Sequence, residues 1–308
     1  MSENTDVASL YSAIEESARL LDVTCSRDRV WPILTAYGDA IAQAVVAFRV
    51  ATGARHKGEL DCRFTTRPDV DPYALALSNG FTAATDHPVG ALLSGIDARC
   101  PVDSYGIDFG VVGGFKKIWA FFPPDDLQGL ATLADIPAMP SGLAENVGFF
   151  ARHGLDDRAN LIGIDYHHRT VNVYVGEPPA ECLTPEAVSS MLRDLGMPDP
   201  SEQLLTLSQR AFGVYATLSW DSATIERITF AVMTPDPTTL PVRIEPKIER
   251  FVKSAPYAVD PADAADRKFV YAVSSAPDGE YYKLQSYYQW RPRILSRMRL
   301  ANPAAELV

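Results

Sequence analysis

The sequence of 308 residues is poor in several features that would point to particular classes of protein. Its four cysteines, Cys25, Cys62, Cys100 and Cys182, lie far apart, form no Cys-x-x-Cys pair and have no nearby histidine. This spacing argues against a zinc site and favours reduced thiols. No apolar run approaches the ~20 residues that span a bilayer, and the first residues, MSENTDVASL, do not have the pattern of a signal peptide. We therefore expect a cytoplasmic protein that does not bind a membrane.

Basic residues are in deficit, because 28 lysines and arginines stand against 39 acidic residues and give a formal net charge of -11. The cations are also scattered along the chain, whereas a surface that follows a phosphate backbone needs a basic stripe. We therefore expect no nucleic acid among the partners. An Asp-Asp-x-x-Asp motif is absent too, which disfavours chemistry that depends on paired aspartates and several magnesium ions.

Helical periodicity recurs along the whole chain. Asp6 is a suitable N-cap for the first amphipathic segment, and Thr184-Pro185 is a typical helix start. Ser141 is expected to cap another helix, which Gly154 should end. Helices are predicted at 6–22, 73–80, 88–98, 141–154, 184–195, 245–253 and, with a basic composition, at 292–300.

Strand patterns fall in pairs between these helices. The dipeptide Gly113-Gly114 is the clearest hairpin signal, because glycine tolerates the positive φ of tight primed turns. The five predicted pairs are 41–50 with 58–67, 102–112 with 115–123, 160–166 with 170–176, 210–220 with 226–233, and 268–274 with 280–290.

Because each predicted strand pair is preceded by helical sequence, we expect an α+β protein with ααββ repeats. We expect a single antiparallel β-barrel of about ten strands, surrounded by helices, whose polar lumen is wide enough to hold a ligand. Residues 1–308 would form one domain, and a closed barrel needs no partner to cover a sheet edge, so a monomer is expected. An arrangement with two separate sheets is the structural alternative.

Four cations stand inside these strand patterns among aromatic residues. Lys117, Arg227 and Lys283 occur in GFKKIWAFF, IERITFAVM and YYKLQSYYQW, and Arg63 occurs in LDCRFTTR. Alternating side chains put Lys117 on the same strand face as Trp119. Positive charge among rings in an acidic protein indicates an anionic ligand with an apolar portion.

Several stretches of the chain resemble the aromatic prenyltransferases with the ABBA fold, or PT barrel, and most of all the bacterial geranyltransferases that act on hydroxynaphthalenes. The resemblance implies transfer of a geranyl or dimethylallyl group from its diphosphate to a carbon of a phenolic, hydroxynaphthalene or other fused aromatic acceptor in secondary metabolism. Geranyl is the preferred donor. The stretches that carry it are ELD at 59–61, GGFKKIWAFFP at 113–123, AENVGFFARHGLD at 144–156, APYAV at 255–259 and EYYKL at 280–284.

The resemblance also implies roles for individual residues. Trp119 and Gln285 replace a tyrosine and a glycine of the related geranyltransferases, so the identity of the acceptor does not carry over. The implied diphosphate-binding residues are Lys117, Arg227, Lys283, Asn172, Tyr215 and Arg63. The implied catalytic residues, which flank the prenyl chain or accept a proton, are Trp119, Tyr174, Tyr215 and Tyr287. The implied acceptor-binding residues are Phe212, Gly213, Ala231, Val270, Gln285 and Tyr287.

Metal use depends on two residues that share a strand face. Asp61 matches the carboxylate that binds Mg²⁺ in metal-dependent members of the family, and a hard cation can bridge it to a diphosphate. Arg63 lies two residues further on, where its guanidinium can neutralise Asp61 or hold the diphosphate directly. We expect no required cofactor, with Mg²⁺ at Asp61 as the alternative. Asp108 is either a further partner of this group or an ordinary strand residue.

A second class of function uses the same features. A non-catalytic carrier of an anionic hydrophobic small molecule would need the same cations and rings, and the sequence alone leaves it open. A carrier would bind diphosphate or its aromatic ligand without releasing pyrophosphate.

Overall fold

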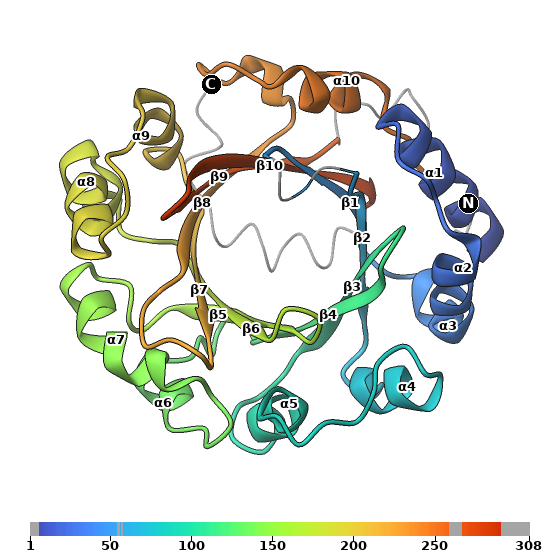
Figure 1. Cartoon of the computed structure of the whole chain (residues 1–308), viewed down its shortest axis with the longest axis horizontal. Coiled ribbons are helices and arrows are strands. Elements are labelled where there is room, and N and C mark those ends of the chain that lie inside the picture. Colours follow the sequence, from blue (N-terminus) through green and yellow to red (C-terminus); the bar gives the residue numbers. More distant parts are fainter. Residues whose placement is uncertain (1–5, 54–55, 57, 259–266, 291–308) are drawn as a thin grey trace.

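The computed structural model describes residues 6–53, 56, 58–258 and 267–290, and their ten strands close into one antiparallel barrel (Figure 1). Each strand pairs with its neighbours in sequence, and β1 pairs with β10 to complete the ring. The fold class is therefore the predicted one, and the two-sheet alternative is wrong. The strands are β1 Val46–Ala51, β2 Asp61–Thr66, β3 Ser104–Gly110, β4 Gly114–Phe121, β5 Ala159–Asp165, β6 Thr170–Gly176, β7 Gly213–Ser219, β8 Arg227–Thr234, β9 Phe269–Ala276 and β10 Gly279–Gln289.

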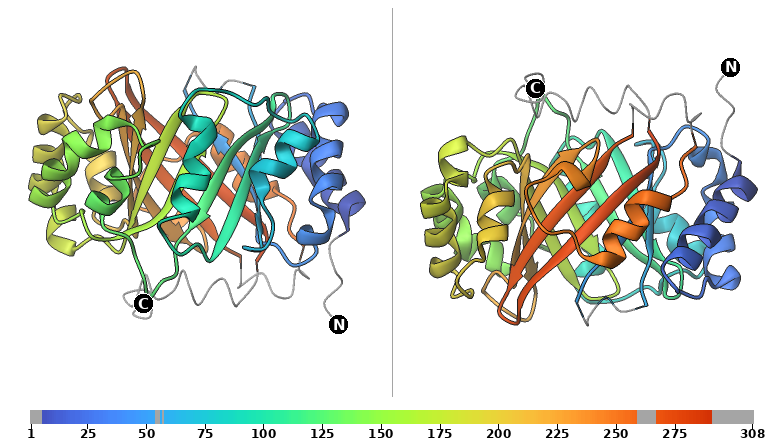
Figure 2. Two further views of the ribbon diagram at one scale, coloured as in Figure 1. Left: turned by 90° about the horizontal axis from the view of Figure 1, so that it is seen from below. Right: turned by 90° about the horizontal axis from the view of Figure 1, so that it is seen from above.

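Helices surround the barrel and connect one hairpin to the next, while the strands that form the barrel wall are tilted relative to the barrel axis (Figures 1 and 2). No helix in the described part of the chain is long and apolar enough to cross a bilayer. The α-helices are α1 Val7–Leu20, α2 Arg27–Ala36, α3 Gly38–Ile41, α4 Pro72–Ser78, α5 Val89–Asp97, α6 Leu130–Ala134, α7 Ser141–Arg152, α8 Pro185–Asp194, α9 Glu202–Ser208 and α10 Pro246–Ser254. Two short 3₁₀ helices are η2 Ala180–Leu183 and η3 Pro237–Thr239.

Local signals explain most helix ends. The Asp6 side chain accepts a hydrogen bond from the Ser9 backbone N–H at 2.6 Å, and Thr184 caps α8 in the same way. Gly154, with a φ of 63°, follows the end of α7 as predicted. The predicted helix at 292–300 lies outside the described residues.

Two predicted boundaries are wrong. Ser141 is the first helical residue of α7 and not its cap, because Pro140, with a ψ of 132°, already has the non-helical conformation of the N-cap. The apolar run from residue 41 belongs first to α3, and β1 begins only at Val46. A short apolar run has no periodicity that separates a buried helix end from a strand.

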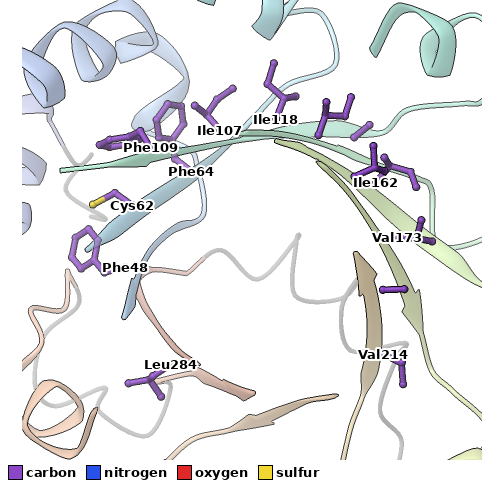
Figure 3. Close-up of a cluster of buried hydrophobic side chains, with 14 of the residues drawn as sticks. Phe48, Cys62, Phe64, Ile107, Phe109, Ile118, Ile162, Val173, Val214 and Leu284 are labelled. Atoms are coloured by element: carbon purple, nitrogen blue, oxygen red, sulfur yellow. The ribbon is translucent and has the colours of Figure 1, made fainter. Parts of the chain in front are cut away.

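The hydrophobic core lies outside the barrel wall, between the strands and the helices. Side chains such as Phe48, Phe64, Ile118 and Val173 are at most 2% exposed and project from the outer face of the barrel (Figure 3). Since strand side chains alternate, every residue that packs on this core leaves its neighbours facing the lumen. The apolar exterior core thus frees the inner face for polar and aromatic side chains.

Candidate active site

The lumen holds a cavity of about 430 Å³ to which all ten strands or their ends contribute residues. Most of its charged residues lie toward the end where consecutive strands form hairpins, as with Asp61 and Arg227 at the starts of β2 and β8, whereas Asp103 and Glu177 lie toward the opposite end. Phe121, Phe212 and Val270 lie toward the opposite end. One cavity therefore has a charged end and a mainly apolar end.

Asp61 is held between two cations. Its Oδ1 accepts a hydrogen bond from Lys116 Nζ at 2.7 Å, and its Oδ2 accepts from the Arg49 guanidinium. Burial raises the pKa of this carboxyl, but Arg49 and Lys116 together bring it well below the usual aspartate range. Asp61 is therefore ionised and has both oxygens occupied.

Arg63 does not neutralise Asp61, which corrects one of the two roles considered for it. Its Nη2 lies 3.1 Å from Asp108 Oδ2, and its guanidinium carbon stands 4.3 Å from the centre of the Trp119 ring. Asp108 is fully buried and also lies 3.6 Å from Arg49. Burial raises the pKa of Asp108, and nearby Asp61 adds to this rise despite the two arginines.

Lys117 has a carboxylate partner of its own. Its Nζ lies 2.9 Å from Asp165 Oδ2, and the backbone N–H of His168 donates to Asp165 Oδ1 at 2.8 Å. Burial raises the pKa of Asp165, but Lys117 and His168 outweigh this and bring it far below its ordinary value. The Lys117 charge is thus already balanced before any ligand enters.

Arg227 and Lys283 differ from the other lumen cations, because neither has a carboxylate partner among the described residues. Burial lowers the pKa of Lys283 to about 8, and Arg227, Arg49 and Lys117 contribute to this in spite of Tyr281. The Lys283 Nζ lies 4.9 Å from the centre of the Tyr281 ring. Although burial raises the pKa of Tyr281, Lys283 and Arg227 bring it down to about 7. This end of the cavity therefore carries positive charge that no carboxylate of the described residues balances, and that partly ionised Tyr281 offsets only in part at neutral pH.

A polar row leads from the charged end to the aromatic side chains. Thr217 donates to Asn172 Oδ1 at 2.9 Å, and Asn172 Nδ2 donates to the Tyr174 hydroxyl at 3.3 Å. The Trp119 Nε1–H donates to the same hydroxyl at 3.2 Å. The rings of Tyr174 and Tyr215 are 4.2 Å apart with an interplanar angle of 51°. The predicted ring residues are therefore brought together beside Asn172.

Trp119 fits its place because both of its neighbours across the sheet are glycines. Gly106 and Gly163 pair with Trp119 on β3 and β5. A Cβ on Gly163 would lie 2.6 Å from the indole Nε1, and one on Gly106 would lie 3.0 Å from its Cε3. The sequence prediction missed these glycines, and the only available signal was their position in strands, where glycine often marks a close approach.

The residues predicted to bind the acceptor fall into two groups. Phe212, Val270, Gln285 and Tyr287 line the cavity, mostly toward its apolar end. Gly213 pairs with Ala231 across β7 and β8, and neither is a lining residue in the described part of the cavity. A Cβ on Gly213 would lie 2.9 Å from the Tyr215 ring, so this glycine makes room for Tyr215.

The structure adds several charged or titratable residues that the sequence prediction did not select. Four of them take part in the ion pairs and charge interactions described above, namely Arg49, Lys116, Asp165 and Tyr281. Alternation along β1 and β10 could have indicated Arg49 and Tyr281. Lys116 could not be found in this way, because the register between β3 and β4 shifts and leaves it as the extra residue of a β-bulge. The bulge lets both Lys116 and Lys117 reach the lumen.

Both carboxylate oxygens of Asp61 are engaged by cations in the unliganded protein. Mg²⁺ binds through one or two carboxylates together with phosphate oxygens and water, so at Asp61 it would have to displace the Arg49 guanidinium or the Lys116 ammonium group. The described residues contain no group of three or more His, Cys, Asp or Glu side chains that could hold a metal ion by themselves.

These features define a class of protein, namely a closed barrel whose lumen has a cationic end suited to an anionic group and a mainly apolar end lined in part by aromatic side chains. The chain belongs to the family described as aromatic prenyltransferase Orf2, whose model matches residues 5–298. This confirms the resemblance seen in the sequence, and the protein is an aromatic prenyltransferase.

Three curated relatives agree with this assignment. The chain is 52% identical over 295 residues to 5,10-dihydrophenazine-1-carboxylate 9-dimethylallyltransferase of Streptomyces anulatus, covering 96% of this chain and 97% of the relative. It is 54% identical to flaviolin linalyltransferase of Streptomyces virginiae, covering 94% and 95% of the two chains. It is 53% identical to the furaquinocin biosynthesis prenyltransferase of Streptomyces sp. (strain KO-3988), covering 97% and 95%.

Two solved structures share the fold at low sequence identity. One is prenyltransferase PriB in a ternary complex with L-tryptophan and dimethylallyl thiolodiphosphate, with a TM-score of 0.55, 13% identity and coverage of 93% of this chain and 98% of that chain. The other is a 6-dimethylallyl tryptophan synthase, with a TM-score of 0.52, 14% identity and coverage of 93% and 96%. At this identity the two structures support the fold alone.

Proposed function

We propose that this protein transfers a dimethylallyl or geranyl group from its diphosphate to a carbon of a fused aromatic acceptor, such as a hydroxynaphthalene or a phenazine. The names of two relatives, which refer to dihydrophenazine-1-carboxylate and flaviolin, support acceptors of this size. The cavity volume of about 430 Å³ is within the usual range for sites that enclose small organic molecules.

One observation carries the proposal, namely the unbalanced charge of Arg227 and Lys283. A diphosphate placed between them would neutralise two enclosed cations and raise the pKa of Lys283 back toward its ordinary value. Lys117 would add a third positive group while it remains paired with Asp165. Asn172 and the Tyr215 hydroxyl, whose pKa burial keeps well above its usual value, would complete the diphosphate contacts as neutral groups.

The reaction then follows from the arrangement of the two ends. The C1–O bond of the allylic diphosphate breaks, its electron pair leaves with the pyrophosphate oxygen, and the cationic end stabilises the developing negative charge. The ring faces of Tyr174 and Tyr215, with the edge of Trp119, stabilise the allylic cation. An electron-rich ring carbon of the acceptor forms the new C–C bond and then loses its proton to water.

Tyr287 has an orienting role in this scheme. Burial raises the pKa of Tyr287 to about 12, so its hydroxyl is protonated at neutral pH and can donate a hydrogen bond to the acceptor. A neutral phenol is a poor base, which favours water as the final proton acceptor.

The proposal includes activity without a divalent metal. In metal-dependent chemistry a divalent ion balances the charge of the diphosphate. Here Arg227 and Lys283 supply positive charge directly, while Arg49 and Lys116 occupy the oxygens of Asp61. We expect product formation to persist in EDTA.

The test is a mass-spectrometric search for prenylated product. Dimethylallyl or geranyl diphosphate is incubated with hydroxynaphthalenes, other phenolics and dihydrophenazines, with Mg²⁺ or with EDTA. Lys283→Met should lose most of the activity, whereas the control Lys253→Met, at an exposed lysine on α10, should retain it. Tight pyrophosphate binding without product from any acceptor would support a carrier instead, and product only with Mg²⁺ would refute the metal-independent scheme.

A further inference from the structure

The fields of the lumen cations overlap, because Arg49 and Arg63 both contact Asp108 Oδ2, but it is the charge of Arg63 that acts on Tyr287. Arg227, Arg49 and Lys117 each contribute to lowering the pKa of Lys283, so their positive charges meet at the hairpin end of the barrel. The charge of Arg63 instead opposes the rise in the pKa of Tyr287, which burial drives to about 12. The field of Arg63 therefore reaches the part of the cavity assigned to the acceptor.

Strand register places Arg63 near Tyr287. Ala47 on β1 pairs with Arg63 on one side and with Tyr287 on the other, so these two side chains flank a small residue on the inner face. Arg63 is also in register with Asp108 on β3 and, through it, with Lys117 on β4. Lys283 pairs with Ala51, four residues further along β1, which is about 14 Å along the strand at roughly 3.4 Å per residue.

Arg63 is held in place but is not fully neutralised. Its guanidinium stacks on Trp119 at 4.3 Å and contacts Asp108 through Nη2 at 3.1 Å. Asp108 Oδ2 is shared with Arg49, so a single carboxylate faces two guanidinium groups and balances Arg63 only in part. The Arg63 Nε–H has no hydrogen-bond partner within the described residues. A planar guanidinium fixed on an indole face is well suited to donate hydrogen bonds to a planar oxyanion.

We infer that Arg63, with Tyr287 across Ala47, recognises an anionic oxygen on the aromatic acceptor, and that it selects acceptors with a carboxylate or an ionised hydroxyl group. This inference rests on the proposed function and names the acceptor class within it. It assigns Arg63 to the acceptor, whereas the family resemblance implied a role with the diphosphate. An ionised hydroxyl also makes the ring more nucleophilic, so recognition and reactivity would favour the same acceptors.

The experiment compares matched acceptors with saturating prenyl diphosphate. One pair is 5,10-dihydrophenazine-1-carboxylate and 5,10-dihydrophenazine, kept reduced under anaerobic conditions. The other pair is a dihydroxynaphthalene and its dimethyl ether, which has no hydroxyl group to ionise. For each pair, the selectivity is the ratio of kcat/KM for the acceptor with the ionisable group to kcat/KM for the acceptor without it.

Arg63→Gln should lower this ratio by about 10- to 100-fold, because it removes charge-assisted hydrogen bonds. Arg63→Lys keeps a positive charge beside Asp108 but loses the forked geometry, so the ratio should fall more for the carboxylate pair than for the phenol pair. The control Arg227→Gln should raise the KM for the donor and change both ratios by less than about threefold. A loss confined to one pair identifies the carboxylate or the phenolate as the group recognised.

The inference is overturned if Arg63→Gln raises the donor KM or weakens pyrophosphate binding as much as Arg227→Gln does, with both ratios unchanged. If the wild-type protein converts no acceptor, the proposed function fails, but the inference can still be tested. Binding of dihydrophenazine-1-carboxylate and of dihydrophenazine, followed by tryptophan fluorescence, should then show the same loss of preference in Arg63→Gln. Equal preference in the two proteins would refute it.

Discussion

Replacing Lys283 by methionine and replacing Lys117 by methionine should change stability in opposite directions, although both lysines face the same lumen. Lys283 is an enclosed cation without a carboxylate partner among the described residues, and methionine removes its charge while keeping a side chain of similar length. Lys117 lies 2.9 Å from Asp165, so its replacement leaves a buried carboxylate without its cation. We therefore expect Lys283→Met to stabilise the unliganded protein and Lys117→Met to destabilise it.

The magnitudes follow from the surroundings of the two lysines. A fall in the pKa of Lys283 from 10.5 to about 8 corresponds to about 3 kcal/mol of unfavourable free energy for the charged form. Because Lys283 lines the cavity, water screens part of this effect, and we expect a gain of about 1 to 2 kcal/mol in the free energy of unfolding. Breaking the buried pair of Lys117 and Asp165 should cost about 3 kcal/mol.

The stability gained by Lys283→Met should decrease as the pH rises. The folded-state pKa of Lys283 lies below its ordinary value of 10.5, so the wild type bears the full penalty below pH 8 and loses it as the pH rises toward 10.5. The advantage of Lys283→Met should therefore be largest near pH 6, where Tyr281 is also neutral, and should shrink above pH 8.

Urea denaturation of the three proteins at pH 6, 7 and 9 measures these differences. Pyrophosphate should raise the unfolding midpoint of the wild type and have little effect on Lys283→Met, because binding to the native state alone stabilises it. Destabilisation of both variants to a similar degree would refute the reasoning, since it would mean that Lys283 is balanced in the native protein.

Three further predictions concern catalysis, packing and the Asp61 cluster. Because the pKa values of Lys283 and Tyr281 lie at about 8 and 7, kcat/KM for the donor should fall in two steps above pH 7, and Tyr281→Phe should leave a single step. Gly163→Ala should reduce stability by about 1 to 3 kcal/mol and alter the tryptophan fluorescence, because its Cβ would meet the Trp119 indole at 2.6 Å. Asp61→Asn should reduce stability by about 3 kcal/mol by leaving two cations without their shared carboxylate, and this difference should narrow below pH 4, as wild-type Asp61 is protonated in the unfolded chain.

Each of these predictions has an outcome that would contradict it. An unchanged two-step pH profile in Tyr281→Phe would show that another pair of groups titrates. Gly129→Ala serves as a packing control, because no atom outside its immediate neighbours comes nearer than 3.8 Å to its Cβ. A loss of stability in this control equal to that of Gly163→Ala would attribute the effect to backbone conformation. If Asp61→Asn were as stable as the wild type, water would have to solvate Arg49 and Lys116 in place of the lost carboxylate.

Alternation and turn chemistry made the architecture predictable from the sequence. Gly113-Gly114 between alternating strands indicated one hairpin, and helix caps such as Asp6 and Thr184 marked the segments between strand pairs. These signals depend on a few neighbouring residues, so they can be recognised without knowing how the rest of the chain folds. The same alternation placed Lys283 and Trp119 on inner strand faces, which the cavity confirms.

Only the closed barrel decided which charges neutralise one another. The sequence left two roles for Arg63, to neutralise Asp61 or to hold the diphosphate, because Arg63 and Asp61 are next neighbours on one strand face. The barrel instead brings Arg49 from β1 and Lys116 from the β3–β4 bulge to Asp61, and gives Arg63 to Asp108. Lys117 and Lys283 look alike in the sequence, yet one has a carboxylate on the adjacent strand and the other has none in the described residues.

The sequence by itself therefore determined the strands, their inner and outer faces and the family of the protein, because these depend on local periodicity and on motifs within single segments. The tertiary structure alone decided the ion pairs, the unbalanced charge at Arg227 and Lys283, and the space that Gly106 and Gly163 leave for the Trp119 indole. Those features depend on register between strands far apart in the chain, and a shift of one residue in that register would move every side chain to the other face.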